Sequence, residues 1–242
     1  MTRNYLTLCA LGASAIAVHG ASIGINFGSN RANSALAPGD SAGVIAQANW
    51  NNAPGGSGTI ASLNNDTGGA SGVSLSWTAD EAWSVQTAAT SGPDGTLLNG
   101  FISDNNTAGN GATSKVDITG ITYATYDLYI YISHDRSFED VILSETGSSA
   151  FGPFTAVEDN TNPTAAVTWN QQTTSATGSG NYVLFAGLTA STLNIDMAAV
   201  DLGSGTLERN AISGIQIVQV PEPSSAALLG LAGLALFMRR RR

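Results

Sequence analysis

The chain has 242 residues, a formal net charge of −9 and a single cysteine. Residues 21–220 contain seventeen acidic and four basic residues, a net charge of −13, which argues against nucleic-acid binding because phosphate recognition needs a basic surface. The cysteine, Cys9, lies close to the N-terminus, so residues 21–220 contain neither a disulfide, nor a thiolate nucleophile, nor a cysteine-based zinc site.

Residues 1–20 have the three parts of a secretory signal peptide. Arg3 supplies the positive charge, Tyr5–Val18 forms the apolar region, and small or compact residues precede Ala21. The sequence therefore predicts export through the Sec translocon, with cleavage before Ala21 or directly after it.

The region from residue 21 to 219 is predicted to form short strands separated by turn-rich loops. The clearest alternation is at Tyr126–Ile132, where one face is apolar and the other carries Asp127, Tyr129 and Tyr131. The complete set of predicted strands is Ser22–Phe27, Val73–Thr78, Val116–Ile118, Tyr126–Ile132, Val141–Leu143, Ala165–Trp169, Tyr182–Phe185, Leu193–Met197 and Ile212–Val218.

Helical periodicity is scarce. Short helical turns are predicted at Ala42–Trp50 and Ala79–Trp83. Glycine, proline, asparagine and aspartate mark the predicted loops and turns, which are Pro54–Gly56, Asp66–Gly69, Ser91–Gly95, Gly109–Gly111 and Thr177–Gly180.

About nine strands at this spacing predict a single all-β domain at 21–219, a β-sandwich of jelly-roll-like form. The opening Ile23–Gly28 and the closing Ile212–Val218 resemble the first and last strands of galactose-binding-like and malectin-like sandwiches. That resemblance implies that the two terminal strands lie in the same region. It says little about activity, because such sandwiches host many functions.

Residues 220–242 have three parts: the tripeptide Pro221, Glu222 and Pro223, the uncharged apolar stretch 224–238, and four arginines, Arg239, Arg240, Arg241 and Arg242. As a transmembrane helix the apolar stretch is about 22 Å long, so spanning a ~30 Å hydrocarbon core requires snorkelling arginines and a locally thinned bilayer. Basic residues stay on the cytoplasmic side, which places the preceding domain outside the cytoplasm.

This tail resembles the PEP-CTERM sorting signal of Gram-negative bacteria, which is also catalogued as an ice-binding protein C-terminal motif without implying that ice is bound. The resemblance implies that an exosortase recognises residues 221–223, cleaves near them and removes the helix. A precursor anchored in the inner membrane then becomes a cell-surface or extracellular protein. A plain C-terminal membrane anchor is the alternative.

Aromatic residues beside polar ones could bind sugars, because a pyranose ring offers an apolar face surrounded by hydroxyl groups. The candidates are Trp50, Trp83, Tyr129 and Tyr131, with core packing and cross-strand pairing as the alternative for each. Acidic loops could hold one structural calcium ion through Asp104, Asp140 and Asp159. No cofactor is otherwise predicted.

Catalytic patterns are weak. His134, the only histidine after residue 20, is predicted to lie in a solvated loop. A glycosidase would need two facing carboxylates, for which the glutamates on offer are Glu81, Glu139, Glu145, Glu158 and Glu208. The sequence therefore favours a non-catalytic matrix protein that binds carbohydrate or exopolysaccharide. A structural or adhesive protein without a defined ligand is the first alternative, and a glycoside hydrolase-like enzyme is the second.

Overall fold

The computed structural model describes residues 20–106, 113–135, 140–148, 150–159, 161–199 and 208–222. The regular secondary structure of these residues consists of strands and one short helix, α1 (Gly92–Leu97). The strands are β1 (Ser22–Phe27), β2 (Asn51–Ala53), β3 (Ser57–Ile60), β4 (Ser74–Thr78), β5 (Glu81–Ser84), β6 (Gly100–Asn106), β7 (Thr113–Thr119), β8 (Tyr126–Tyr131), β9 (Asp140–Glu145), β10 (Phe154–Val157), β11 (Tyr182–Leu188), β12 (Thr192–Ala199), β13 (Glu208–Ile212) and β14 (Gly214–Gln219).

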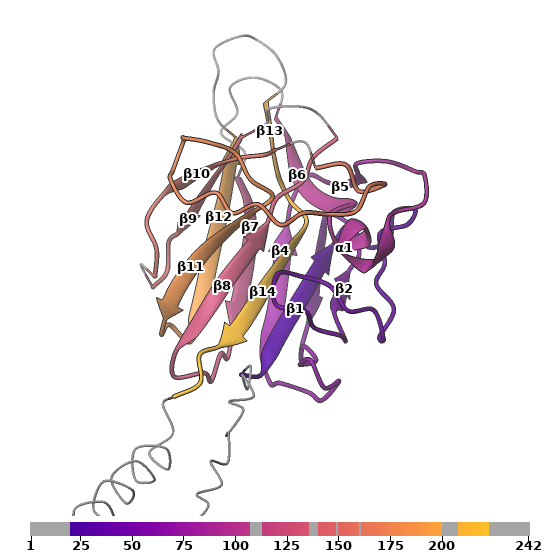
Figure 1. Ribbon diagram of the computed structural model, residues 1–242. Helices are drawn as coiled ribbons and strands as arrows, with labels where there is room; N and C mark the ends of the chain where they lie inside the picture. The colour runs from indigo at the N-terminus through magenta and orange to yellow at the C-terminus, as the bar shows by residue number, and fades with distance from the viewer. Residues whose placement is uncertain are drawn as a thin grey trace, which may run out of the picture.

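Two main sheets lie face to face and form the predicted β-sandwich (Figure 1). The five-stranded sheet has the order β11-β8-β14-β1-β2, and the six-stranded sheet has the order β10-β9-β12-β7-β4-β3. A third sheet, β13-β6-β5, lies toward the end of the sandwich shown at the top of Figure 1. The all-β sandwich predicted from the sequence is therefore the fold of the protein.

The first and last strands of the domain are neighbours. β1 pairs with β14 in antiparallel register, with Ile23 opposite Ile217 and Ile25 opposite Ile215. This arrangement confirms the prediction that the two terminal strands lie together. It also makes the five-stranded sheet depend on both ends of the domain, since β14 joins β1 to β8.

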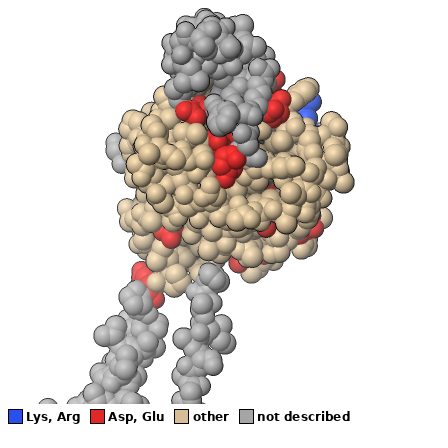
Figure 2. All heavy atoms as spheres, turned by 45° about the horizontal axis from the view of Figure 1, so that its top comes forward, with Lys and Arg blue, Asp and Glu red and all other residues tan. Residues whose placement is uncertain are grey.

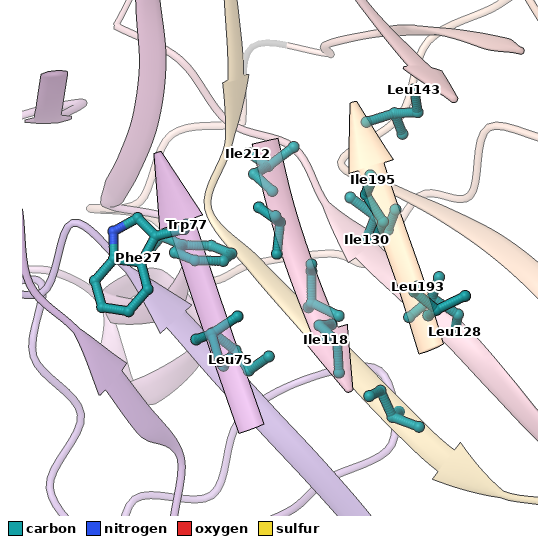
Figure 3. Close-up of a cluster of buried hydrophobic side chains, with 14 of the residues drawn as sticks. Phe27, Leu75, Trp77, Ile118, Leu128, Ile130, Leu143, Leu193, Ile195 and Ile212 are labelled. Atoms are coloured by element: carbon teal, nitrogen blue, oxygen red, sulfur yellow. The ribbon is translucent and has the colours of Figure 1, made fainter. Parts of the chain in front are cut away.

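The main core fills the space between the two large sheets (Figure 3). Alternate residues of each strand point inward, and fully buried branched side chains such as Ile118, Leu128 and Ile195 meet there. Phe27 and Trp77 add an edge-to-face ring contact, with centroids 6.2 Å apart. Burial of each large apolar side chain contributes about 1.5–3 kcal/mol, so this core holds the sheets together without a disulfide.

A second apolar cluster covers the outer face of the five-stranded sheet. Tyr129 and Tyr131 of β8 pack there against Trp50 and Leu36, which come from the long connection between β1 and β2. The predicted two-faced pattern of residues 126–132 is confirmed, because Leu128 and its alternates face the main core. Both faces of β8 are buried, so the tyrosine face does not line an open surface.

Several local predictions were wrong. Residues 42–50 form turns closed by a bridge between Ala42 and Gln47, and no helix is present there. Residues 81–84 form β5 because they pair with β6 and direct Ala82 into the core. The predicted loop 91–95 contains the start of α1, which has proline in its first turn, a position where a missing N–H is harmless. Residues 165–169 are not a strand but part of a loop.

Candidate functional site

The folded domain ends immediately before the Pro-Glu-Pro tripeptide. The last strand, β14, ends at Gln219, whose backbone N–H donates to the carbonyl of Ala21 at 2.9 Å. The next residue, Val220, donates its backbone N–H to the carbonyl of Thr125, also at 2.9 Å. Pro221 and Glu222 follow and are exposed. The tripeptide therefore begins where backbone pairing to the sandwich stops.

The described chain enters and leaves the sandwich at the same end. The hydrogen bond between Gln219 and Ala21 places the two ends side by side, at the bottom of Figure 1 and away from β13. Pro223, the predicted membrane segment 224–238 and the arginines at 239–242 lie outside the described residues. The predicted signal peptide does as well, except for its last residue. Among the residues that are described, no helix is long and apolar enough to cross a membrane.

Three of the four aromatic candidates are buried. Trp50 is 5% exposed, Tyr129 7% and Tyr131 0%, so none of them offers an open ring to a sugar, and the interpretation as core side chains holds for them. The indole N–H of Trp50 donates to the carbonyl of Gln47 at 3.0 Å. Trp83 alone is largely exposed, at 44%, with the guanidinium of Arg31 4.7 Å from its ring centroid.

Tyr131 fastens the connection between β1 and β2 onto the sheet. Its hydroxyl donates to Oε1 of Gln216 at 2.7 Å and accepts the backbone N–H of Val44 at 2.9 Å. Gln216 in turn donates to the carbonyl of Ile45 and to Oε1 of Gln47. Burial raises the pKa of the Tyr131 hydroxyl well above its ordinary value. This network is structural, because every hydrogen bond in it joins parts of the folded domain.

A pocket of about 410 Å³ lies in the loop between β10 and β11. Its lining combines one aromatic ring with carboxylate, amide and hydroxyl groups, and two alanines give it a small-residue wall. The lining residues are Asp159, Thr161, Asn162, Ala165, Ala166, Thr168, Trp169 and Asn170. This pocket was not predicted from the sequence, because residues 165–169 were assigned to a strand. The polar run from Asp159 to Thr164 is nevertheless typical of a loop.

The calcium candidates are not brought together. Asp104 is buried on β6, where it accepts hydrogen bonds from Ser114 at 2.6 Å and from Asn210 at 3.1 Å. Asp140 begins β9, where burial raises the pKa of its carboxyl group, and Asp159 lines the pocket. Over the described ranges, no three histidine, cysteine, aspartate or glutamate residues form a group that could hold a metal ion.

His134 is not in a solvated loop, as the sequence suggested, but is buried at 4% exposure. Its ring packs on Phe101 with centroids 4.8 Å apart, and its Nδ1 lies 3.2 Å from Oδ1 of Asp135. The neighbouring residues 136–139, which include Arg136 and Glu139, lie outside the described residues. This environment shows that the histidine packs within the domain.

Glu145 is a structural carboxylate. It accepts backbone N–H groups from Gly147, Ser148, Ala150 and Asn194 at 2.8–3.0 Å, and the Ser148 hydroxyl at 2.9 Å. Burial alone would raise its pKa, but these hydrogen bonds outweigh burial and lower the pKa to about 2. A group that stays ionised at such low pH cannot act as a general acid near neutrality.

Comparison with known proteins bears on the tail alone. A search of curated proteins and of solved structures finds no match. A family model described as the PEP-CTERM protein-sorting motif matches residues 219–242, beginning at the last residue of β14. Residues 219–242 are therefore a PEP-CTERM protein-sorting motif, which implies export, processing by an exosortase and a cell-surface destination.

Proposed function

We propose that this protein is a non-catalytic polysaccharide-binding module of the cell surface or extracellular matrix. In this proposal the Sec translocon exports the chain, and residues 224–238 hold the precursor in the inner membrane. The exosortase then cleaves near residues 221–223 and frees the sandwich. Pro221 and Glu222 are exposed and directly follow Val220, which makes the last backbone hydrogen bond to the sandwich; this supports direct access of the enzyme to the tripeptide.

The observation that carries the binding role is the pocket around Trp169. Sugar recognition uses a flat aromatic ring with directed polar groups around it, and this pocket provides both in a space of about 410 Å³. Cell-surface sorting places such a pocket where polysaccharides are abundant. The acidic character of residues 21–220 favours neutral polymers over polyanions, since like charges repel.

The contacts of Glu145 and Glu81 support binding without hydrolysis. Glu145 is saturated by five donor groups, and Glu81 accepts from the Ser103 hydroxyl at 3.2 Å. Glu139 and the side chain of Glu208 lie outside the described part of the chain. Among the described residues, Asp159 is the one carboxylate that lines the pocket, whereas hydrolysis by the usual mechanism needs two.

Affinity gel electrophoresis tests the binding role. The processed protein is run through gels containing neutral polysaccharides, anionic polysaccharides or the exopolysaccharide of the producing organism. We expect migration to be retarded by at least one neutral polymer, in proportion to its concentration. Unchanged migration in every gel would reject the proposal.

A structural or adhesive role without a defined ligand is the second candidate. The outer face of the six-stranded sheet favours it, because β4, β7 and β12 present mainly small polar side chains there, such as Ser76, Asp117 and Asn194. A hollow of about 230 Å³ on this face has no aromatic lining residue. Saturable binding of one defined sugar would argue against this candidate.

A further inference from the structure

We propose that the pocket around Trp169 binds one neutral pyranose unit of a polysaccharide, with Asp159 and Asn170 bonding its hydroxyls and Asn181 positioning the pocket. This inference rests on the proposed function and assigns its ligand class and its residues. The pocket volume of about 410 Å³ lies at the lower end of the ~300–1,000 Å³ usual for small-molecule sites. A space of that size suits one sugar ring, or two at most.

Asn181 fixes the positions of three residues that line the pocket. Its side chain is 1% exposed, and its Oδ1 accepts the backbone N–H of Asn170 at 2.9 Å. Its Nδ2 donates to the hydroxyl of Thr161 and to the carbonyl of Thr168, each at 2.8 Å. One buried amide therefore fixes three residues of the lining, and a pocket fixed before binding loses less entropy when the ligand arrives.

Asp159 and Asn170 form the polar edge of the pocket. Oδ1 of Asp159 accepts the Thr161 hydroxyl at 2.5 Å, and Oδ2 accepts Nδ2 of Asn170 at 3.1 Å. Each carboxylate oxygen has a second lone pair, which can accept a sugar hydroxyl. The Asn170 side chain is exposed and also donates to the carbonyl of Ser179. Its Oδ1 supplies a further acceptor beside the carboxylate.

Trp169 supplies the apolar face. Its ring is half-buried and packs against Tyr131 at 5.1 Å and Tyr182 at 6.3 Å between centroids, so neighbouring rings fix its orientation. An aromatic ring held in this way can stack on the C–H face of a pyranose without a further loss of side-chain freedom. Trp83, the exposed tryptophan that the sequence suggested, is outside the lining of this pocket.

The charge of the surroundings selects a neutral sugar. Residues 21–220 carry a net charge of −13, and Figure 2 shows acidic side chains spread over the visible face with little basic surface. The lining contains one carboxylate and no basic residue. A uronate or sulfated sugar would meet Asp159 without a compensating cation, which disfavours polyanions.

The experiment measures binding of the full chain in detergent to neutral and anionic polysaccharides, by affinity electrophoresis with and without EDTA. Asp159→Asn keeps the shape of the side chain but weakens the acceptors, and Ala166→Tyr fills the pocket from its exposed wall. We expect affinity for the retarding neutral polymer to fall roughly tenfold or more in each variant. Trp83→Ala, outside the pocket, serves as the matched control and should bind as the parent does.

The outcomes separate the inference from the proposed function. Retardation that persists in both pocket variants overturns this site and leaves polysaccharide binding standing. Retardation of no polymer by the parent chain rejects the proposed function and the site with it. Binding that EDTA abolishes and calcium restores would also overturn the inference, because it would make Asp159 a metal ligand. Circular dichroism spectra equal to that of the parent show that each variant is folded.

Discussion

Replacing Trp50 by alanine is expected to lower the free energy of unfolding by about 3–5 kcal/mol, the range for large-to-small changes at buried aromatic sites. The indole is 5% exposed and donates to the carbonyl of Gln47. Gly24 and Gly43 leave space for it, since an added Cβ would lie 2.5 Å from the indole at Gly24 and 2.9 Å from it at Gly43. Chemical denaturation followed by tryptophan fluorescence measures the change.

Trp83→Ala is the control, because both tryptophans qualified as sugar-stacking candidates from sequence. Trp83 is 44% exposed and interacts with Arg31, so its removal should change the free energy of unfolding by about 1 kcal/mol or less. Equal destabilisation by the two variants would contradict the assignment of Trp50 to the second apolar cluster.

Replacing Glu145 by glutamine is expected to lower the free energy of unfolding by about 2–4 kcal/mol at neutral pH. Five donor groups converge on the carboxylate, and a glutamine would direct its own N–H₂ at some of them. Asp117→Asn on the solvent-facing side of the same sheet is the control, with an expected change below about 0.5 kcal/mol. Urea denaturation of both variants at pH 7 makes the comparison.

The pH dependence of stability gives an independent test of the same carboxylate. Its folded-state pKa of about 2 lies below the ordinary value of 4.5, so ionisation favours the folded state. The stabilisation, on the order of 3 kcal/mol, is fully present above about pH 4.5 and disappears as the pH falls toward 2. Glu145→Gln should therefore remove part of the loss of stability in that pH range. A variant that loses stability with pH as the parent does would contradict the hydrogen-bond network.

Sequence periodicity predicted the strands whose two faces differ. Tyr126–Ile132 and Leu193–Met197 alternate over enough residues to define both a strand and its inward face, and both were found. The short strands β2 and β3 were among the strands that were missed, because three or four mainly polar or small residues carry no such signal. The helical turn predicted at 79–83 failed because pairing with β6 overrides local preference.

The candidate functional residues were also predicted only in part. The sorting motif could be predicted because its tripeptide, apolar stretch and basic cluster follow one another in contiguous sequence. The pocket could not be predicted from the sequence, because it depends on tertiary hydrogen bonds. The buried Asn181, just before β11, bonds to Thr161, Thr168 and Asn170. The burial of Trp50 and Tyr131 could not be predicted either. An aromatic residue near polar residues has the same sequence pattern whether or not a loop covers its ring. Predicting that a single aromatic residue stacks on a sugar therefore requires knowing from the fold whether its ring is exposed.

The most direct test of the account is the intact mass and cellular location of the protein in its own host, with and without the exosortase. We expect a species that ends near residues 221–223, lacks the arginines at 239–242 and is found outside the cell only when the exosortase is present. A full-length species retained in the membrane of both strains would contradict it, and would make the tail a plain anchor.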